Sequence, residues 1–99
     1  MPADPVVTLC VLLWARAGEN DALIAYEDAV LQLVSTHGGR VVQRARTDGA
    51  GDAPLEIHLL EFPSTDALDA YMRDPARAAM ASDRDRAIAR TDVHRVNIV

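Results

Sequence analysis

The fold is decided by an apolar stretch near the start of the sequence, Val6-Val-Thr-Leu-Cys-Val-Leu-Leu-Trp14. Its residues are mostly β-branched or aliphatic and show no helical periodicity, which predicts a buried β-strand. The following Ala15-Arg-Ala17 is similar to a signal-peptide cleavage site, but residues 1–5 include no basic side chain, which a secretory leader requires. The stretch is also much shorter than the roughly 20 residues that span a bilayer. We therefore expect a strand in a cytoplasmic protein that has no membrane partner.

Residues 20–37 predict an amphipathic helix. Asn20 is a suitable N-cap, and Asp21 lies in the first turn, where the helix dipole favours negative charge. Gly38 can take the left-handed conformation that ends a helix. The apolar stripe consists of residues spaced by three and four, namely Leu23, Tyr26, Val30, Leu33, Val34 and His37.

Two further strands are predicted at residues 40–46 and 55–62, joined as a hairpin. The first of these is the more polar, which favours an edge position in the sheet. The segment between them is rich in Gly, Asp and Ala, a composition typical of loops.

Two capping signals follow the hairpin. Ser64 or Thr65 can cap a helix that extends to Arg73, because a hydroxyl oxygen can accept a hydrogen bond from an amide in the first helical turn. The pair Asp74-Pro75 begins another helix, since it combines a capping carboxylate with proline at the first helical position.

The element order predicts the fold. Ser82-Asp-Arg-Asp85 has the pattern of a capping box with Asp in place of Glu, so the last helix is expected to break and restart there, and residues 93–99 predict the final strand. The resulting order, β-α-β-β-α-β, with right-handed crossovers, predicts an α+β, ferredoxin-like fold with a four-stranded antiparallel sheet and helices on one face. The strands at 6–14 and 55–62 are expected in the centre.

Composition limits the classes of function. The 99 residues and 10.7 kDa indicate a single domain, residues 1–99. The single cysteine, Cys10, excludes a disulfide framework and a multi-cysteine metal cluster. The formal charge of −5 and the scarcity of aromatic residues on the central strands argue against a nucleic-acid partner, because RNA-binding versions of this fold need stacking aromatics on a basic sheet face.

One face of the predicted sheet is too apolar to be exposed to water. Alternate residues of a strand share a face, and we place Leu12 and Trp14 on the uncovered face together with Leu60 and Phe62. At roughly 25 cal/mol per Å² of apolar surface, leaving these four side chains in water forgoes several kcal/mol, and such patches mark interfaces. We therefore expect a homodimer formed sheet face to sheet face.

Several motifs resemble those of a known superfamily. They are Gly18, Tyr26, His37-Gly38-Gly39-Arg40, Arg44, Glu61-Phe62-Pro63-Ser64 and Asp74-Pro75. From Val6 to about Val96 the chain is similar to the dimeric α/β-barrel superfamily and, within it, to a small bacterial family of unknown function related to antibiotic-biosynthesis-monooxygenase-like proteins. The superfamily also includes muconolactone isomerases and haem-degrading oxygenases. The resemblance implies a dimeric barrel with a pocket between sheet and helices, but fold alone does not specify chemistry.

Arg44 and His58 are the candidate catalytic residues. Arg44 matches an arginine that looks typical of the narrower family, and the expected hairpin register places it opposite His58 and places Arg46 opposite Glu56. A guanidinium beside an imidazole could bind a carboxylate or enolate and transfer a proton. The alternative is a structural polar pair at a strand edge or dimer interface, because a register change of one residue would move every side chain to the other face.

Further residues are candidates for ligand contacts. Thr8, Cys10 and Asn97 are expected beside the Arg44–His58 pair. The alternative for Cys10 is that it is a small buried apolar residue of the core. The resemblance also suggests Arg84 as a ligand contact. The alternative is that Arg84 belongs to a solvent-exposed helix face. The complete set of expected ligand contacts is Thr8, Cys10, Trp14, Leu60, Phe62, Arg84 and Asn97.

Metal and cofactor sites are not expected. The histidines and carboxylates lack metal-ligand spacings, and His37 is interpreted as a helix cap next to Gly38. Haem would need an axial ligand, for which His58 is the one candidate, and an aromatic pocket that the sequence does not indicate. Two hypotheses remain: a homodimer that binds a small organic molecule, with cofactor-independent monooxygenase or isomerase chemistry, and a non-catalytic oligomerisation or regulatory module.

Overall fold

The computed structural model describes residues 6–99, which form one sheet and several short helices. The strands are β1 (Val7–Ala15), β2 (Arg40–Arg46), β3 (Glu56–Phe62) and β4 (Ile88–Arg95). The helices are α1 (Asn20–Val30), α2 (Gln32–Thr36), α3 (Thr65–Met72), α4 (Pro75–Ala78) and α5 (Ala81–Ala87). Within this range, every helix is too short or too polar to cross a bilayer.

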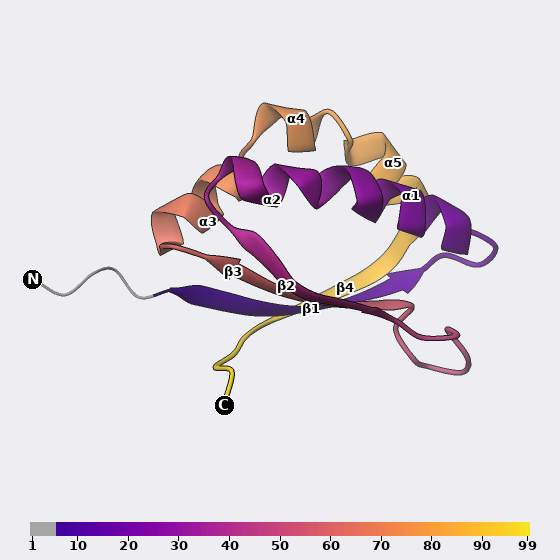
Figure 1. Cartoon of the computed structure of the whole chain (residues 1–99). Helices are drawn as coiled ribbons and strands as arrows, with labels where there is room; N and C mark the ends of the chain where they lie inside the picture. Colours follow the sequence, from indigo (N-terminus) through magenta and orange to yellow (C-terminus); the bar gives the residue numbers. More distant parts are fainter. Residues whose placement is uncertain (1–5) are drawn as a thin grey trace, which may run out of the picture.

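The sheet has the predicted ferredoxin-like arrangement. Its strand order is β2-β3-β1-β4, with antiparallel neighbours throughout, so β1 and β3 are central and β2 is at an edge, as predicted. All the helices lie over one face, and the C-terminal residues extend away from the other face (Figure 1). The sheet therefore has one face covered by its own chain and one open face.

The capping signals explain where several elements begin and end. The Ser64 hydroxyl accepts a hydrogen bond from the Ala67 amide at 3.1 Å, and the Asp74 carboxylate accepts one from the Ala76 amide at 2.8 Å. Gly38 has a φ of 75° after α2, the left-handed conformation that the sequence predicts. These three boundaries are confirmed.

Other expected boundaries are wrong. The helix predicted over residues 20–37 is interrupted at Leu31 and forms α1 and α2, and Asn20 is the first helical residue and not the cap. The break before α5 is confirmed, but this helix begins at Ala81 without a side-chain cap. The last strand begins at Ile88 and not at residue 93, because β4 continues directly from α5 along the edge of β1.

The register of β1 and β3 corrects the predicted open face. Leu9 lies opposite Leu60, so Leu60 and Phe62 face the helices, where they are 4% and 0% exposed. The expectation that they share the open face with Leu12 and Trp14 is wrong. Both alternations of β1 are apolar, so its periodicity could not show which residues of β3 lie on the same side.

The open face nevertheless has an apolar centre. The central strands place there the side chains of Cys10, Leu12, Trp14, Ile57 and Leu59. The edge strands contribute charged groups, including the ion pair between Arg90 and Asp92 at 2.7 Å. The Arg90 guanidinium also lies 4.5 Å from the Trp14 ring centroid, so part of the apolar surface is covered by a charged side chain.

The core under the helices consists of two clusters. One contains Leu13, Leu23, Tyr26, Val30, Leu55, Ala87 and Ile88. The other contains Val7, Leu9, Val34, Leu60, Phe62 and Tyr71. Three ionisable side chains, Glu27, Glu56 and His58, are buried in the same layer. Buried ionisable groups are rare unless they are paired or functional, and they direct attention to the space between sheet and helices.

Candidate functional site

A cavity of about 320 Å³ lies between the sheet and the helices. It is lined by members of both core clusters. Its apolar wall consists of Leu9, Val11, Leu13, Val30, Leu31, Leu60 and Leu68. Met72 and Val93 also line it and are 51% and 55% exposed, which places its entrance near the end of α3 and the edge strand β4.

Polar side chains from six elements line the same cavity. Helix α1 supplies adjacent residues, Tyr26 and Glu27, and β3 supplies His58. The remaining groups come from the last third of the chain and are Asp69, Tyr71, Arg77, Arg84 and Thr91. An apolar cavity with a few convergent polar groups is the usual form of a small-molecule site.

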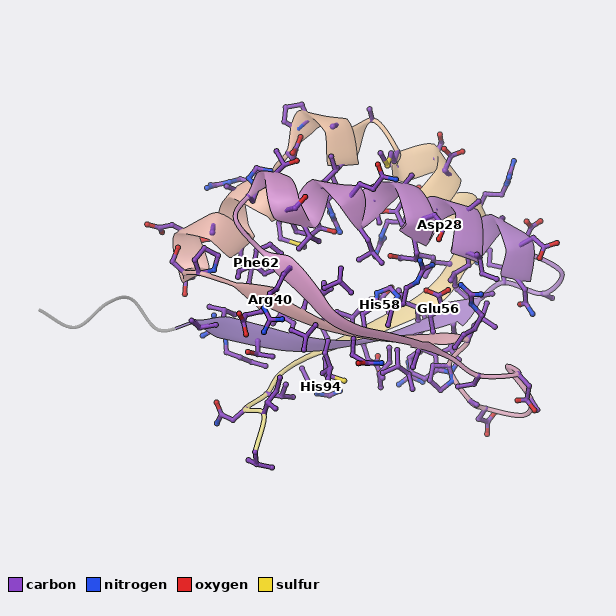
Figure 2. The ribbon with its side chains drawn as sticks, in the orientation of Figure 1. Asp28, Arg40, Glu56, His58, Phe62 and His94 are labelled. Carbon is purple, nitrogen blue, oxygen red and sulfur yellow. The ribbon has the colours of Figure 1, made fainter. Side chains whose placement is uncertain are left out.

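His58 is held by a buried carboxylate. Its Nε2 lies 2.8 Å from Glu56 Oε1, and the two side chains are 1% and 0% exposed. Figure 2 shows both between the sheet and the helices, whereas His94 lies on the opposite side of the sheet. An ionised carboxylate can only accept hydrogen bonds, so Nε2 carries the proton and Nδ1 is left as an acceptor. Glu56 therefore fixes both the ring orientation and the tautomer.

Two arginines of β2 hold Glu56 in turn. Arg44 donates from Nε and Nη2 to its two oxygens at 2.8 and 3.0 Å, and Arg46 donates from Nε at 2.9 Å. Arg44 also bridges to Asp28 at 2.7 Å. Burial raises the pKa of Glu56, but the hydrogen bonds from Arg44, His58 and Arg46 outweigh it, so the net pKa is lowered. Glu56 is therefore a carboxylate at neutral pH.

Glu27 is the ionisable group on the cavity side of His58. Its Oε2 lies 3.9 Å from His58 Nδ1, and the residue is 5% exposed. Burial raises the pKa of Glu27 from 4.5 to about 7, with a further increase from the charge of Glu56, while Arg44 and other arginines oppose it. At neutral pH this carboxyl group is present in both protonation states.

His58 remains uncharged in this environment. Burial lowers the pKa of His58 from 6.5, and the hydrogen bond to Glu56 offsets only part of that effect. A neutral imidazole with a free Nδ1 and a carboxyl group with a pKa near 7 thus lie next to each other in the cavity wall. Glu27 is suited to accept and return a proton near neutral pH, and the unprotonated Nδ1 of His58 provides an acceptor beside it.

The structure brings only some of the expected site residues together. The register of the hairpin is confirmed, with Arg44 opposite His58. His58, Leu60 and Arg84 line the cavity. Arg44 does not, and is connected to the lining residue His58 through Glu56.

The other expected contacts lie elsewhere. The grouping of Thr8 and Cys10 with His58 is wrong, because these residues, like Trp14, point to the open face of the sheet. Phe62 packs against Tyr71, with ring centroids 5.3 Å apart, outside the cavity lining. Asn97 follows β4 and is exposed.

Sequence reasoning missed Glu27, the central polar group. A signal was present, since Leu23, Tyr26, Glu27 and Val30 follow the helical spacing of three, four and seven that defines one face. A charged residue within an apolar stripe indicates a buried ionisable group. The pairing of His37 with Asp74 at 2.7 Å joins the end of α2 to the start of α4 outside the cavity, which is consistent with a structural histidine.

Within residues 6–99, no group of three or more histidine, cysteine, aspartate or glutamate side chains has an arrangement that could hold a metal ion.

Comparisons with known proteins are consistent with this architecture. A protein of unknown function from Rhodopseudomonas palustris superposes with a TM-score of 0.78 at 17% identity, covering 97% of this chain and 84% of that one. A dimeric protein of unknown function with a ferredoxin-like fold from Bacteroides fragilis gives 0.73 at 14% identity, covering 98% and 100%. A proposed antibiotic biosynthesis monooxygenase from Caulobacter crescentus gives 0.78 at 14% identity, covering 97% and 92%. At these identities the likeness shows the fold alone.

The sequence comparisons assign the family. No curated protein matches the chain with significance. The profile of a domain of unknown function, DUF1330, matches residues 12–97, which include every polar residue of the cavity wall. The chain belongs to the DUF1330 family and has its ferredoxin-like fold.

Proposed function

We propose that the protein binds a small organic molecule in the cavity between sheet and helices and transfers a proton to and from it. The observation that carries this proposal is the Glu27–His58 pair. Both side chains are buried in the cavity wall, where Glu27 has a raised pKa and His58 is uncharged. Glu56 orients the imidazole, and the Arg44 and Arg46 side chains keep Glu56 ionised. Arg44 is therefore a positioning residue in this scheme.

The proposed chemistry is removal of a proton from a carbon next to a carbonyl, or from a phenol. An isomerase would return the proton at a different atom of the same molecule. A cofactor-independent monooxygenase would let the resulting anion react with O₂, with one oxygen atom entering the product and the other leaving as water. The structural likeness to a proposed monooxygenase supports considering the monooxygenase reaction as well as the isomerase reaction. Both reactions begin with removal of the proton.

Proton abstraction can be tested without knowing the product. Wild-type protein in D₂O is incubated with a panel of enolisable ketones and keto acids, and loss of the α-hydrogen signal is followed by ¹H NMR. We expect exchange with at least one compound and a decrease of roughly 100-fold or more for Glu27→Gln and for His58→Asn, as is usual when an acid–base group is removed. Glu19→Gln, which removes a carboxylate outside the cavity, is the matched control.

A non-catalytic module is the second candidate. It is favoured by the hydrogen bonds among Arg44, Glu56 and His58, because a saturated buried network can serve stability and fold specificity alone. If compounds bind in the cavity and none exchanges its hydrogen, the enzymatic proposal is rejected and the binding or regulatory one is supported.

We further propose that two copies associate through the open faces of their sheets. The apolar centre formed by Leu12, Trp14, Ile57 and Leu59 with a charged periphery is the usual pattern of an interface, and a solved structural neighbour is dimeric. Light scattering at micromolar concentration should give a dimer for the wild type and a folded monomer for Leu59→Asp. Ala29→Asp, on the exposed side of α1, should remain dimeric. A folded wild-type monomer would reject the association.

A further inference from the structure

Two arginines of the cavity wall have no carboxylate partner. Elsewhere in residues 6–99, Arg40, Arg44, Arg46 and Arg90 each form an ion pair with a carboxylate. Arg77 and Arg84 lie within 4.0 Å of no carboxylate in the same range, although both line the cavity. Arg16, Arg73, Arg86 and Arg95 also form no ion pair in this range, but they do not line the cavity. Arg77 and Arg84 are therefore the two guanidinium groups of the cavity wall, and neither is paired with a carboxylate.

Arg77 carries the more specific signal. Its guanidinium lies 5.3 Å from the centroid of the Tyr71 ring, which fixes its position at the cavity wall. Its Nε is buried and has no hydrogen-bond partner. Leaving a buried donor unsatisfied is costly, more so on a charged group, so an acceptor that belongs to a bound molecule explains this atom.

Arg84 approaches the same region from α5. Its one polar contact among the described residues is a long one, 3.4 Å from Nη2 to the Thr91 hydroxyl. Arg77 and Arg84 each lower the pKa of Tyr26 and of Glu27 through their positive charges, and all four side chains line the cavity. Both guanidinium groups therefore act on the part of the wall that contains Glu27 of the proposed acid–base pair.

The carboxyl groups of the lining do not neutralise the two arginines. Glu27 is partly protonated near neutral pH, and Asp69 is exposed on α3. The rest of the wall is apolar, so a bound molecule needs an apolar body and one anionic end. The cavity volume of about 320 Å³ lies at the lower end of the range for small-molecule sites.

We infer that the ligand is a small organic carboxylate whose anionic group is held by Arg77 and Arg84, with its apolar body against the aliphatic wall of the sheet. This inference rests on the proposed use of the cavity and adds the class of molecule it takes. The carboxylate end lies beside Glu27 and His58, so the atoms next to it are the ones exposed to proton transfer. Planar guanidinium groups suit such a carboxylate because they can donate two parallel hydrogen bonds.

The test compares matched probes that differ only in charge. Hexanoate, benzoate, salicylate and 2-oxohexanoate are each titrated against the purified full-length protein by ¹⁵N-HSQC NMR, alongside the corresponding primary amides. We expect at least one carboxylate to bind roughly tenfold or more tightly than its amide, with shifted signals in α1, α4 and α5, because a charge-assisted hydrogen bond is worth at least that factor.

Variants then assign the preference to the two side chains. Arg77→Gln and Arg84→Gln should each reduce the affinity for that carboxylate roughly tenfold or more, with little effect on its amide. Arg73→Gln and Arg86→Gln remove neighbouring arginines outside this cavity and should leave the affinity unchanged. Arg84→Lys retains the charge and should recover part of the loss.

The outcomes separate this inference from the proposed function. If amides bind as tightly as carboxylates, or if no carboxylate binds preferentially, the inference is overturned while hydrogen exchange on uncharged ketones can still support the proposed function. If carboxylates bind selectively but no compound exchanges its hydrogen, the inference stands and the proton-transfer proposal is rejected. If the preference survives in both glutamine variants, the assignment to Arg77 and Arg84 is wrong.

Discussion

Glu27 should make the stability of this protein fall as the pH rises from about 4.5 to about 8. In the folded chain the pKa of Glu27 is raised from 4.5 to about 7, first by burial and then by Glu56. The folded state therefore binds this proton more tightly than the unfolded state, so deprotonation favours unfolding. One pKa unit corresponds to 1.36 kcal/mol, so the rise in the pKa of Glu27 corresponds to about 3 kcal/mol of stability. The loss begins near the unfolded pKa and is complete above the folded one.

The substitution Glu27→Gln measures this cost, because glutamine is nearly isosteric with the protonated acid and cannot ionise. Urea denaturation is carried out for wild type and Glu27→Gln between pH 4.5 and pH 9. Both proteins retain the other two buried groups, Glu56 and His58, so the titration of these groups is common to both. The unfolding free energy of Glu27→Gln relative to wild type should rise by about 3 kcal/mol across this interval. The same comparison for Glu19→Gln, at the start of α1, corrects for the loss of one negative charge.

A flat difference between Glu27→Gln and wild type would refute the reasoning. It would mean that the carboxyl group is solvated or paired in the folded state and that its pKa is ordinary. The carboxyl ¹³C shift of Glu27, followed through the same pH range, gives an independent value for the midpoint. A midpoint below pH 5 would remove the basis for using Glu27 as a proton donor near neutral pH.

Two other stability measurements follow from the structure. Glu56→Gln should lower the unfolding free energy by about 3 kcal/mol or more in urea denaturation at pH 7, because it leaves Arg44 and Arg46 without their buried partner. Since the pKa of Glu56 is lowered, the stability that its carboxylate contributes is complete above pH 4.5 and is lost on acidification. A cost below about 1 kcal/mol would contradict the pairing. Gly39→Ala should lower the thermal midpoint more than Gly18→Ala. A Cβ at position 39 would lie 2.8 Å from a backbone oxygen, whereas at position 18 it would meet nothing within 4 Å and the cost comes only from the left-handed backbone, with a φ of 76°. Equal effects would show that the close approach at Gly39 costs no more than this backbone strain.

The sequence went far toward the fold because the relevant signals are local. Helix boundaries at Ser64 and Asp74 depend on one side chain and the next few amides, and a hairpin register depends on one loop and the two strands that it joins. The misplaced start of β4 shows the limit of such signals. Residues 88–92 have no strand-like alternation of their own and become a strand because the exposed edge of β1 supplies hydrogen-bond partners.

The candidate site was predictable only in part, for the same physical reason. Arg44 and His58 belong to one hairpin, and their pairing was found from local register. The neighbours of His58 across the cavity come from helices, and their positions depend on how α1, α4 and α5 pack on the sheet. No spacing in the sequence relates Glu27 to His58. Arg77 and Arg84 are seven residues apart, but they lie on the separate helices α4 and α5, so helical spacing does not place them together.

By itself the sequence determined the order of strands and helices, the antiparallel sheet and an apolar surface beyond what one layer of helices can cover. Only the tertiary structure decided which side of β3 faces the helices, because both alternations of β1 are apolar and its pattern does not select one side. That choice placed Glu56 and His58 in the interior and not in water. Burial in turn raised the pKa of Glu27, since the cost of removing a charge from water depends on three-dimensional packing and not on the residue's place in the chain.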